Sequence, residues 1–506
     1  MLAFLNKRGI SLGIFICGFI LLFIFFDLPS ILVKSPQSVH LQRQTDGASY
    51  ALNYYQNKQP FFKSQVHQRF AENGYAVSEF PIIYFLASKL YGLFGVHDYY
   101  IRMIHFFLFV IGIIYIYKLS LLSIRNKFFQ FLPVLLFFSS SYIQYYASNF
   151  LPDVASISLA FIGLYYFVLF KKENKYSYFL TAGIFFTIAG LLKISAMILW
   201  VSILIFFIYE RIQSYRDKQT DKLQVKAWLI FLLSFLVLLV WLLFAKYYAL
   251  KYHYGGNLLG FYPIWDASLH EVLSICHRLV IEWMGIIMIW PMWLLICVMF
   301  IYLVKWRKQL ATPLFSITMI SGFGCFVYSL CWFRAFYHHD YYMINLFCFP
   351  VLILLLFLSS FEKILIKQTL AIQCLTYAFI FVIAGYSVLN CAITLQDRYS
   401  ASKYYTINQS LYKVEPYLRK IGIDRNDLVV SIPDSSTNIS LYLMNQSGWT
   451  ECFNSPTYNI YNFIPAGAAY LIVSDSNYIY KEIYSKFCVH EKKIGEFEGI
   501  FIYDLK

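Results

Sequence analysis

Long apolar runs separated by short polar segments dominate the sequence. A helix needs about 20 apolar residues to cross the hydrocarbon core of a bilayer, so each run predicts a membrane span. One run is short and shares a tight turn around Lys193 with the next run. The pattern predicts a polytopic α-helical membrane protein with about 11 transmembrane helices, near residues 10–32, 101–123, 128–147, 154–170, 178–192, 194–210, 227–249, 284–304, 313–332, 342–361 and 370–392.

Lys and Arg are distributed unevenly among the segments that connect these runs. With the N-terminus in the cytoplasm, most of them fall in inner loops, and the short outer turns hold only Lys193 and Arg334. Cytoplasmic loops are enriched in these residues, so the asymmetry predicts this orientation. The first run follows Lys7 and Arg8 and has no small-residue cleavage site after it, which favours a retained anchor over a signal peptide.

Larger polar segments fall on the outer side in this orientation. Residues 33–100 form a first loop with helix-like stretches at 47–57 and 80–93, and residues 250–283 form a second loop. The last 110 or so residues suffice for one small domain. We expect a transmembrane domain over 1–396, which includes the first loop with its amphipathic helices, and an extracytoplasmic domain over 397–506.

The C-terminal segment has the pattern of a small α/β domain. Short runs rich in β-branched residues predict buried strands, and the segments between them have helical spacing. The predicted strands are 427–432, 469–474 and 499–503, and the predicted helices are 436–446 and 477–487.

Composition excludes several classes of protein. The chain is 59% hydrophobic and 13% charged, with a mean hydropathy of +0.58, which excludes a soluble enzyme and a disordered protein. The net charge of +14 comes from loop residues and indicates topology, so we expect no nucleic-acid partner. None of the ten cysteines has metal-site spacing, and Cys452 and Cys488 are open to either a disulfide or two free thiols.

Two aspartates stand at predicted outer helix ends. An acidic side chain beside a bilayer is costly unless it pairs, faces water or takes part in chemistry. Asp46 lies in Gln44–Tyr50 just beyond the first span, and Asp153 follows Pro152 at the start of the fourth. Both positions also suit a helix cap. Capping and catalysis are therefore both open for each aspartate.

Glu79 and Lys193 are the next candidates. Glu79 precedes Pro81 at the start of an amphipathic stretch, where it would either cap the helix or join a cation site. Lys193 lies in an outer turn, against the positive-inside trend. It would either extend toward the membrane surface or bind an anionic group.

The segment Arg334–Tyr342 places a cation, two imidazoles, a carboxylate and phenols within nine residues. Arg334 would give a bidentate contact to a phosphate, with His338, His339 and Tyr341 as further donors. Asp340 would belong to an acceptor or cation site. The other interpretation is an interfacial aromatic belt. The segment His338–Asp340 could also bind a metal, but adjacent histidines rarely bind the same ion, so this is a lesser alternative. If a divalent metal ion is bound, Glu79 and His338 are its candidate ligands.

These motifs occur in an order that resembles a known class of enzymes. The segments are TDG after the first span, EFP before an amphipathic stretch, PD at the fourth span, LLKISA and HHDYY. Together they resemble the GT-C class of membrane glycosyltransferases, most closely bacterial relatives of the protein O-mannosyltransferases and lipid A aminoarabinose transferases. The resemblance covers residues 1–395.

The resemblance implies an inverting transfer of a sugar from a polyprenyl-phosphate donor on the outer face of the membrane. Asp46 matches the first-loop catalytic carboxylate, Asp153 the second acidic position, and Glu79 the acidic residue of a Glu-x-Pro motif. Some relatives have a basic residue after that glutamate, where this chain has Phe80. Phosphate binding is therefore expected to fall on Lys193, Arg334 and the two histidines.

The chemistry that this reaction needs agrees with these residue types. A sugar on a lipid phosphate already has a good leaving group, so the enzyme must deprotonate the acceptor hydroxyl and stabilise the departing phosphate. Asp46 is the expected general base. Asp153 would orient the acceptor or raise the basicity of Asp46 through like-charge repulsion.

Other functions are compatible with parts of the pattern. A polysaccharide ligase or polymerase would also place Arg and His around a lipid phosphate. A transporter or flippase is less favoured, because its ionisable residues would lie near the midplane and internal repeats would be expected. We expect a multi-pass protein of the bacterial inner (plasma) membrane whose partners are the lipid bilayer, the lipid-linked donor and a lipid, glycan or protein acceptor.

Overall fold

The computed structural model describes residues 13, 16–216, 222–254, 260–310, 312–400, 407–452, 460–489 and 492–505. The chain folds into two compact units. The first unit comprises Met1–Val33, Arg102–Leu242 and Leu259–Asp397, and the second comprises Lys34–Ile101, Leu243–Leu258 and Arg398–Lys506. The first outer loop is thus grouped with the C-terminal residues, and the predicted division into 1–396 and 397–506 stays a prediction.

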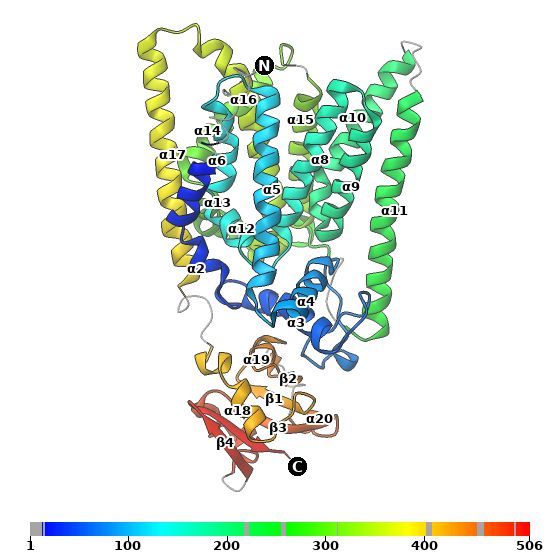
Figure 1. Cartoon of the computed structure of the whole chain (residues 1–506), viewed down its shortest axis with the longest axis vertical. Helices are drawn as coiled ribbons and strands as arrows, with labels where there is room; N and C mark the ends of the chain where they lie inside the picture. Colours follow the sequence, from blue (N-terminus) through cyan, green and yellow to red (C-terminus); the bar gives the residue numbers. More distant parts are fainter. Residues whose placement is uncertain are drawn as a thin grey trace. The chain divides into compact units, whose positions relative to one another are not determined.

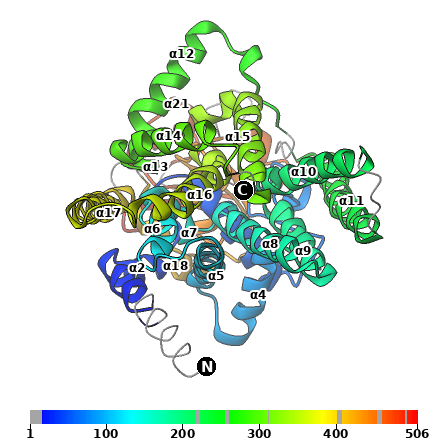
Figure 2. The ribbon, with the colours of Figure 1, turned by 90° about the horizontal axis from the view of Figure 1, so that it is seen from above.

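The first unit is built of apolar helices, drawn largely side by side in Figure 1. Helix α8 packs against α9, and α10 packs against α15, as seen from above in Figure 2. The helices are α2 (Leu28–Leu32), α5 (Tyr99–Ser123), α6 (Leu132–Phe138), α7 (Ser141–Ala147), α8 (Asp153–Glu173), α9 (Tyr176–Leu192), α10 (Met197–Arg216), α11 (Lys222–Lys251), α12 (Leu269–Arg278), α13 (Met284–Ile287), α14 (Trp290–Lys305), α15 (Pro313–Cys331), α16 (Cys348–Leu365) and α17 (Leu370–Tyr399).

The chain is a multi-pass membrane protein. Within the described residues, seven helices are long and apolar enough to cross a membrane, or eight if a pair bent by 93° forms one span. Three other predicted runs coincide with shorter apolar helices, at Ile16–Phe25, Phe129–Phe138 and Tyr176–Leu192. Residues 10–12, 14 and 15 of the first predicted run lie outside the described residues. The count of 11 spans and the orientation of the termini stay predictions.

Three runs that we predicted as single helices are interrupted. The run 128–147 breaks after α6, where the extended backbone of Ser140 lets its hydroxyl accept a hydrogen bond from the Ile143 amide and start α7. The run 284–304 breaks between α13 and α14, where Pro291 occupies the first turn of the new helix. The run 342–361 begins as a 3₁₀ helix, η7 (Asp340–Phe347), before α16.

The second unit contains the helices of the first outer loop. The predicted stretches are helical, with bounds α3 (Leu41–Gln56) and α4 (Ile82–Phe94), and the two helices pack against each other. Most of α3 is buried, including polar side chains at its centre. This burial makes α3 a rigid support for Asp46.

The C-terminal residues form a five-stranded sheet with the order β2-β1-β3-β5-β4. Strands β1, β2 and β3 are parallel, and β5 is antiparallel to β3 and β4. The strands are β1 (Leu428–Ile432), β2 (Gly448–Thr450), β3 (Ala468–Val473), β4 (Lys493–Phe497) and β5 (Ile500–Asp504), and the helices include α18 (Glu415–Lys420), α19 (Ile439–Leu443), α20 (Ile460–Phe463) and α21 (Glu482–Ser485).

The predicted small α/β domain is therefore present. The three predicted strands correspond to β1, β3 and β5, and the two predicted helices shorten to α19 and α21. Leu471 and Val473 of β3 are fully buried in the apolar core. Strands β2 and β4 were not predicted, because β2 has three residues and β4 contains two charged residues and a glycine among its five. Cys452 and Cys488 are free thiols, so the structure contains no disulfide between them.

Candidate functional site

Asp46 lies in the second turn of α3, so it does not cap the helix. The N-cap residue of α3 is His40, and no side chain caps that end. The carboxylate of Asp46 accepts a hydrogen bond of 3.2 Å from Nδ2 of Asn438. Burial raises the pKa of Asp46 to about 6, although the charge of Arg43 and the bond from Asn438 oppose the rise. The side chain is thus a carboxylate that can hold a proton near neutral pH.

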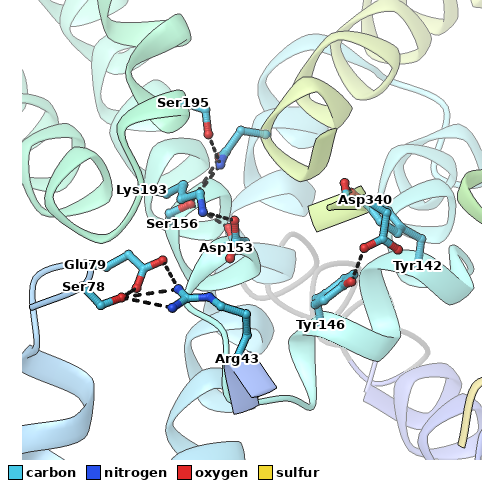
Figure 3. A network of polar contacts seen from close by, with 11 residues as sticks. Arg43, Ser78, Glu79, Tyr142, Tyr146, Asp153, Ser156, Lys193, Ser195 and Asp340 are labelled. Carbon is cyan, nitrogen blue, oxygen red and sulfur yellow. Dashed lines mark hydrogen bonds and ion pairs between the residues drawn. The ribbon is translucent and has the colours of Figure 1, made fainter. Parts of the chain in front are cut away.

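Glu79 pairs with Arg43 and leaves the start of α4 uncapped. Oε1 of Glu79 lies 2.6 Å from Nη2 of Arg43, and the hydroxyl of Ser78 donates to the other carboxylate oxygen (Figure 3). The N-cap residue of α4 is Pro81, without a side-chain hydrogen bond, so the capping interpretation of Glu79 is wrong. This ion pair directs the guanidinium group of Arg43, whose charge lowers the pKa of Asp46, toward Glu79.

Gly47 of the TDG segment allows α3 and α4 to approach closely. A Cβ atom at Gly47 would lie 2.8 Å from Cε1 of Tyr84. Tyr84 is buried, and its ring lies 5.7 Å from that of Tyr50, measured between centroids. The glycine next to Asp46 is therefore required by packing, which fixes the position of the carboxylate relative to α4.

Asp153 forms a buried ion pair with Lys193. Oδ1 of Asp153 lies 3.1 Å from Nζ of Lys193, and the side chains are 0% and 10% exposed (Figure 3). Asp153 is the first residue of α8, whose N-cap residue Pro152 makes no side-chain cap. The positive end of the α8 dipole and the charge of Lys193 both stabilise the ionised carboxylate of Asp153. Lys193 thus pairs with an acidic group of the chain itself, and its binding of a phosphate stays a prediction.

Lys193 is held by the break between α9 and the 3₁₀ helix η3 (Ile194–Ala196). Its backbone is extended, with φ −155° and ψ 119°, which ends α9 and turns the side chain inward. Nζ lies 4.9 Å from the ring centroid of Tyr341 and 4.7 Å from that of Tyr342. Cation–π contacts of this kind stabilise a partly desolvated ammonium group. Lys193 therefore does not extend toward the membrane surface.

Asn345 connects the elements around this pair. Its Nδ2 donates to Oγ of Ser195 at 2.9 Å and to Oγ of Ser156 at 3.2 Å. Oγ of Ser156 lies 2.6 Å from the backbone oxygen of Asp153. Three elements, α8, η3 and η7, are thus tied together by side-chain hydrogen bonds around the ion pair.

Asp340 is fully buried and bound by two tyrosines. The hydroxyl of Tyr146 donates to its Oδ1, and the hydroxyl of Tyr142 donates to its backbone oxygen at 2.5 Å (Figure 3). Asp340 begins η7, which also carries Tyr341 and Tyr342. These bonds anchor the 3₁₀ helix whose rings flank Lys193.

The remaining residues of the Arg334–Tyr342 segment do not form one cluster. Nη2 of Arg334 lies 3.3 Å from Oε1 of Glu271 on α12, in a pair that is 39% and 45% exposed. His338 is exposed, whereas the ring of His339 lies 5.3 Å from that of Tyr341. The structure therefore brings Tyr341 to Lys193, places His339 beside Tyr341, and gives Arg334 a carboxylate partner.

The described residues contain no group of three His, Cys, Asp or Glu side chains that could hold a metal ion. The two residues named as metal ligands belong to different compact units, Glu79 to the second and His338 to the first. Glu79 is also engaged by Arg43 and Ser78.

Several residues of these networks were not singled out in the sequence. They are Arg43, Asn438, Asn345, Tyr146 and Glu271. Only Arg43 gave a local signal, because a cation three residues before Asp46 lies on the same side of a helix. The other four contact their partners across large sequence separations, which a single sequence does not reveal.

Comparison with known proteins identifies the fold. Residues 78–241 match the family model of dolichyl-phosphate-mannose-protein mannosyltransferases. No curated protein sequence matches the chain. Among solved structures, ArnT from Cupriavidus metallidurans in the apo state is 11% identical, with a TM-score of 0.58 over 96% of this chain and 98% of that chain. The same protein bound to undecaprenyl phosphate is 10% identical, with a TM-score of 0.63 over 97% and 98%.

The chain has the fold of the GT-C membrane glycosyltransferases. The resemblance predicted from the sequence motifs is thereby confirmed. An oligosaccharyltransferase from Archaeoglobus fulgidus, solved in complex with Zn and sulfate, is a further structural match. It is 14% identical, with a TM-score of 0.51 over 90% of this chain and 67% of that chain. The GT-C fold therefore extends over nearly all of the present chain.

Proposed function

We propose that the protein is an inverting glycosyltransferase that moves a sugar from a polyprenyl-phosphate donor to an acceptor hydroxyl at the outer face of the bacterial inner membrane. The match of residues 78–241 to a family of mannosyltransferases supports this proposal. ArnT, whose fold the chain shares, has been solved with undecaprenyl phosphate. The bound lipid phosphate in that structure supports the donor class.

The observation that carries the proposal is the raised pKa of the Asp46 carboxyl group. Its pKa is raised by burial to about 6, and Arg43 makes its short ion pair with Glu79. A general base works best when its pKa is close to the pH of the reaction. Asp46 meets this requirement, whereas an exposed aspartate, with a pKa near 4, would be a weaker base.

In the proposed reaction, Asp46 takes the proton of the acceptor hydroxyl as its oxygen attacks the anomeric carbon. The bond between that carbon and the phosphate oxygen breaks on the opposite face, which inverts the configuration. The lipid phosphate leaves with the electron pair, and the proton remains on Asp46. No nucleotide-binding domain is needed, because the lipid phosphate is itself the leaving group.

Lys193 is the proposed donor to the leaving phosphate. Its ammonium group is held by the carboxylate of Asp153 and by the rings of Tyr341 and Tyr342. In this proposal Asp153 has a positioning role through Lys193, in place of direct contact with the acceptor. Charge on the departing phosphate would be stabilised by this preoriented cation.

Further donors to the phosphate are proposed in the Arg334–Tyr342 segment. Arg334 is available because its pair with Glu271 is exposed, and such pairs contribute little. His338 and His339 would add hydrogen bonds. Asp340 would hold the segment in place through Tyr146. Glu79 would orient Arg43 for the acceptor side of the reaction.

The experiment that tests this function is a transfer assay. Detergent-purified protein is incubated with a panel of radiolabelled polyprenyl-phosphate sugars and an envelope extract, with nucleotide sugars as control donors and with or without EDTA. We expect label to move into an acceptor from a lipid-phosphate donor only. The proposal fails if folded protein transfers no label from any lipid-linked donor, or transfers it equally from nucleotide sugars.

A further inference from the structure

The C-terminal sheet has a reversal in strand order next to β1. From β1 the chain passes through α19 to β2 on one side, and then through α20 to β3 on the other side of β1. All three strands are parallel, so their carboxyl ends lie at one edge. In open α/β sheets, ligands bind outside the carboxyl ends of the strands at such a reversal.

A pocket occupies this position between β1 and β3. It has a volume of about 490 Å³ and is lined by residues that directly follow the two strands, Pro433 and Ser474–Ser476. The other lining residues are Asn408 with its neighbour Ile407, and Gly499. Gly499 lies in the turn between β4 and β5 and has a φ of +81°, which favours glycine. Small-ligand sites typically have volumes of about 300–1,000 Å³.

Asn408 holds two walls of the pocket together. Its Nδ2 donates to the backbone oxygen of Ser474 at 2.8 Å, and its Oδ1 accepts from the amide of Ser410 at 2.9 Å. Oγ of Ser410 in turn lies 3.1 Å from the backbone oxygen of Glu498 in the β4–β5 turn. The pocket is therefore built from four segments, at 407–408, 433, 474–476 and 499, and hydrogen bonds from Asn408 and Ser410 connect the first of them to the third and to the β4–β5 turn.

Polar groups remain available at this site. One carboxylate oxygen of Asp475 accepts from the amide of Asn477 at 2.9 Å, and the other oxygen has no hydrogen-bond partner among the described residues. The hydroxyl of Ser476 also makes no hydrogen bond within that part of the chain. A carboxylate oxygen and a hydroxyl together suit a ligand that carries several hydroxyl groups.

The pocket is not suited to an anionic ligand. Among the described residues, no Lys, Arg or His lines it. The backbone amides of Ser436 and Ser440, next to β1, already donate to the carboxylate of Asp434 at 2.8 and 2.7 Å. A phosphate would find these donors occupied and would meet the charge of Asp475. Both features disfavour the nucleotide phosphates that strand reversals often bind.

We propose that this pocket binds a neutral saccharide and is the site where the C-terminal domain recognises the glycan part of the acceptor. Asp475 and Ser476 would bond the sugar hydroxyls, and Ile407 and Pro433 would contact the C–H face of the ring. The link to an acceptor rests on the proposed function. Saccharide binding by the pocket does not depend on it.

The test measures binding and transfer separately on the full-length, detergent-purified protein. Hydrogen–deuterium exchange is followed at residues 407–410 and 474–478 with glucose, galactose, N-acetylglucosamine or cellobiose, and with a Ser/Thr peptide as a non-saccharide probe. Asp475→Asn and Ser476→Ala are compared with the matched control Glu482→Gln, an exposed carboxylate on α21.

We expect at least one saccharide to protect these segments in the wild type and the control, and at least tenfold weaker binding in Asp475→Asn and Ser476→Ala. Sugar release from the lipid-linked donor should be unchanged in all variants. Absence of protection by every saccharide, protection by the peptide only, or unchanged binding in both variants would overturn the inference. If a saccharide binds but the wild type transfers no sugar, the proposed function is wrong, whereas the inference that the pocket binds a saccharide is retained.

Discussion

The ammonium group of Lys193 lies 3.1 Å from the carboxylate of Asp153, and both side chains are withdrawn from solvent. Buried ion pairs need good geometry and additional contacts to offset the loss of hydration. The rings of Tyr341 and Tyr342 supply such contacts for Lys193. The pair therefore keeps a cation available at a site from which water is largely excluded.

Removal of one partner of this pair should destabilise the protein strongly. Lys193→Met or Asp153→Asn leaves the other group buried without its partner, at a cost of about 3–5 kcal/mol. The double variant should recover more than half of that loss. The measurement is the free energy of unfolding in detergent. Lys171→Gln is the control, because its pair with Glu210 is partly exposed and should contribute less than about 1 kcal/mol. Additive single-variant losses would contradict this account.

The transfer rate should depend on the protonation of Asp46. Because burial raises the pKa of Asp46 to about 6, the carboxyl group is protonated below that pH and cannot accept a proton. The rate should therefore fall as the pH decreases through about 6 and level off above it. Initial rates of label transfer between pH 5 and 8 measure this. A rate that is flat over this range would exclude Asp46 as the titrating base.

Arg43 and Glu79 should shift this pH dependence in opposite directions. The charge of Arg43 lowers the pKa of Asp46, whereas that of Glu79 raises it. Glu79→Gln also releases Arg43 from its ion pair, so the midpoint should move to lower pH. Arg43→Gln should move the midpoint to higher pH. Full pH–rate profiles of the two variants test this, and shifts of the same sign would contradict it.

The sequence predicted most of the helices and strands and the candidate side chains of the site. It did not predict which residues those side chains contact. Apolar runs and charged loops predicted the helices, and β-branched runs predicted β1, β3 and β5, because these patterns are local. The break at Pro291 was missed because the residues on both sides are apolar, and the break at Ser140 because the short serine run 139–141 lies within a long, mostly apolar segment. The ion pair of Arg334 with Glu271, 63 residues away, was not predicted, because a single sequence does not show which distant residues meet.

Gly47 should not tolerate a side chain. A methyl group would lie 2.8 Å from the buried ring of Tyr84, so α3 and α4 would have to move apart. Overpacking of this kind costs about 1–3 kcal/mol. Gly47→Ala should therefore lower both the thermal stability and the transfer rate, and Gly47→Ala with Tyr84→Leu should restore part of each. A rate that stays at the wild-type level in Gly47→Ala would show that the close approach of α4 is dispensable.

The most direct test compares transfer and donor binding in Asp46→Asn. The amide keeps the size of the side chain but cannot accept the proton of the acceptor. Glu72→Gln, an exposed carboxyl group in the same outer loop, is the matched control. We expect label transfer from a polyprenyl-phosphate sugar to fall by about 10²–10⁴-fold in Asp46→Asn. Binding of labelled polyprenyl phosphate should remain within about twofold of wild type. Transfer at the wild-type rate by Asp46→Asn would contradict the assignment of Asp46 as the base.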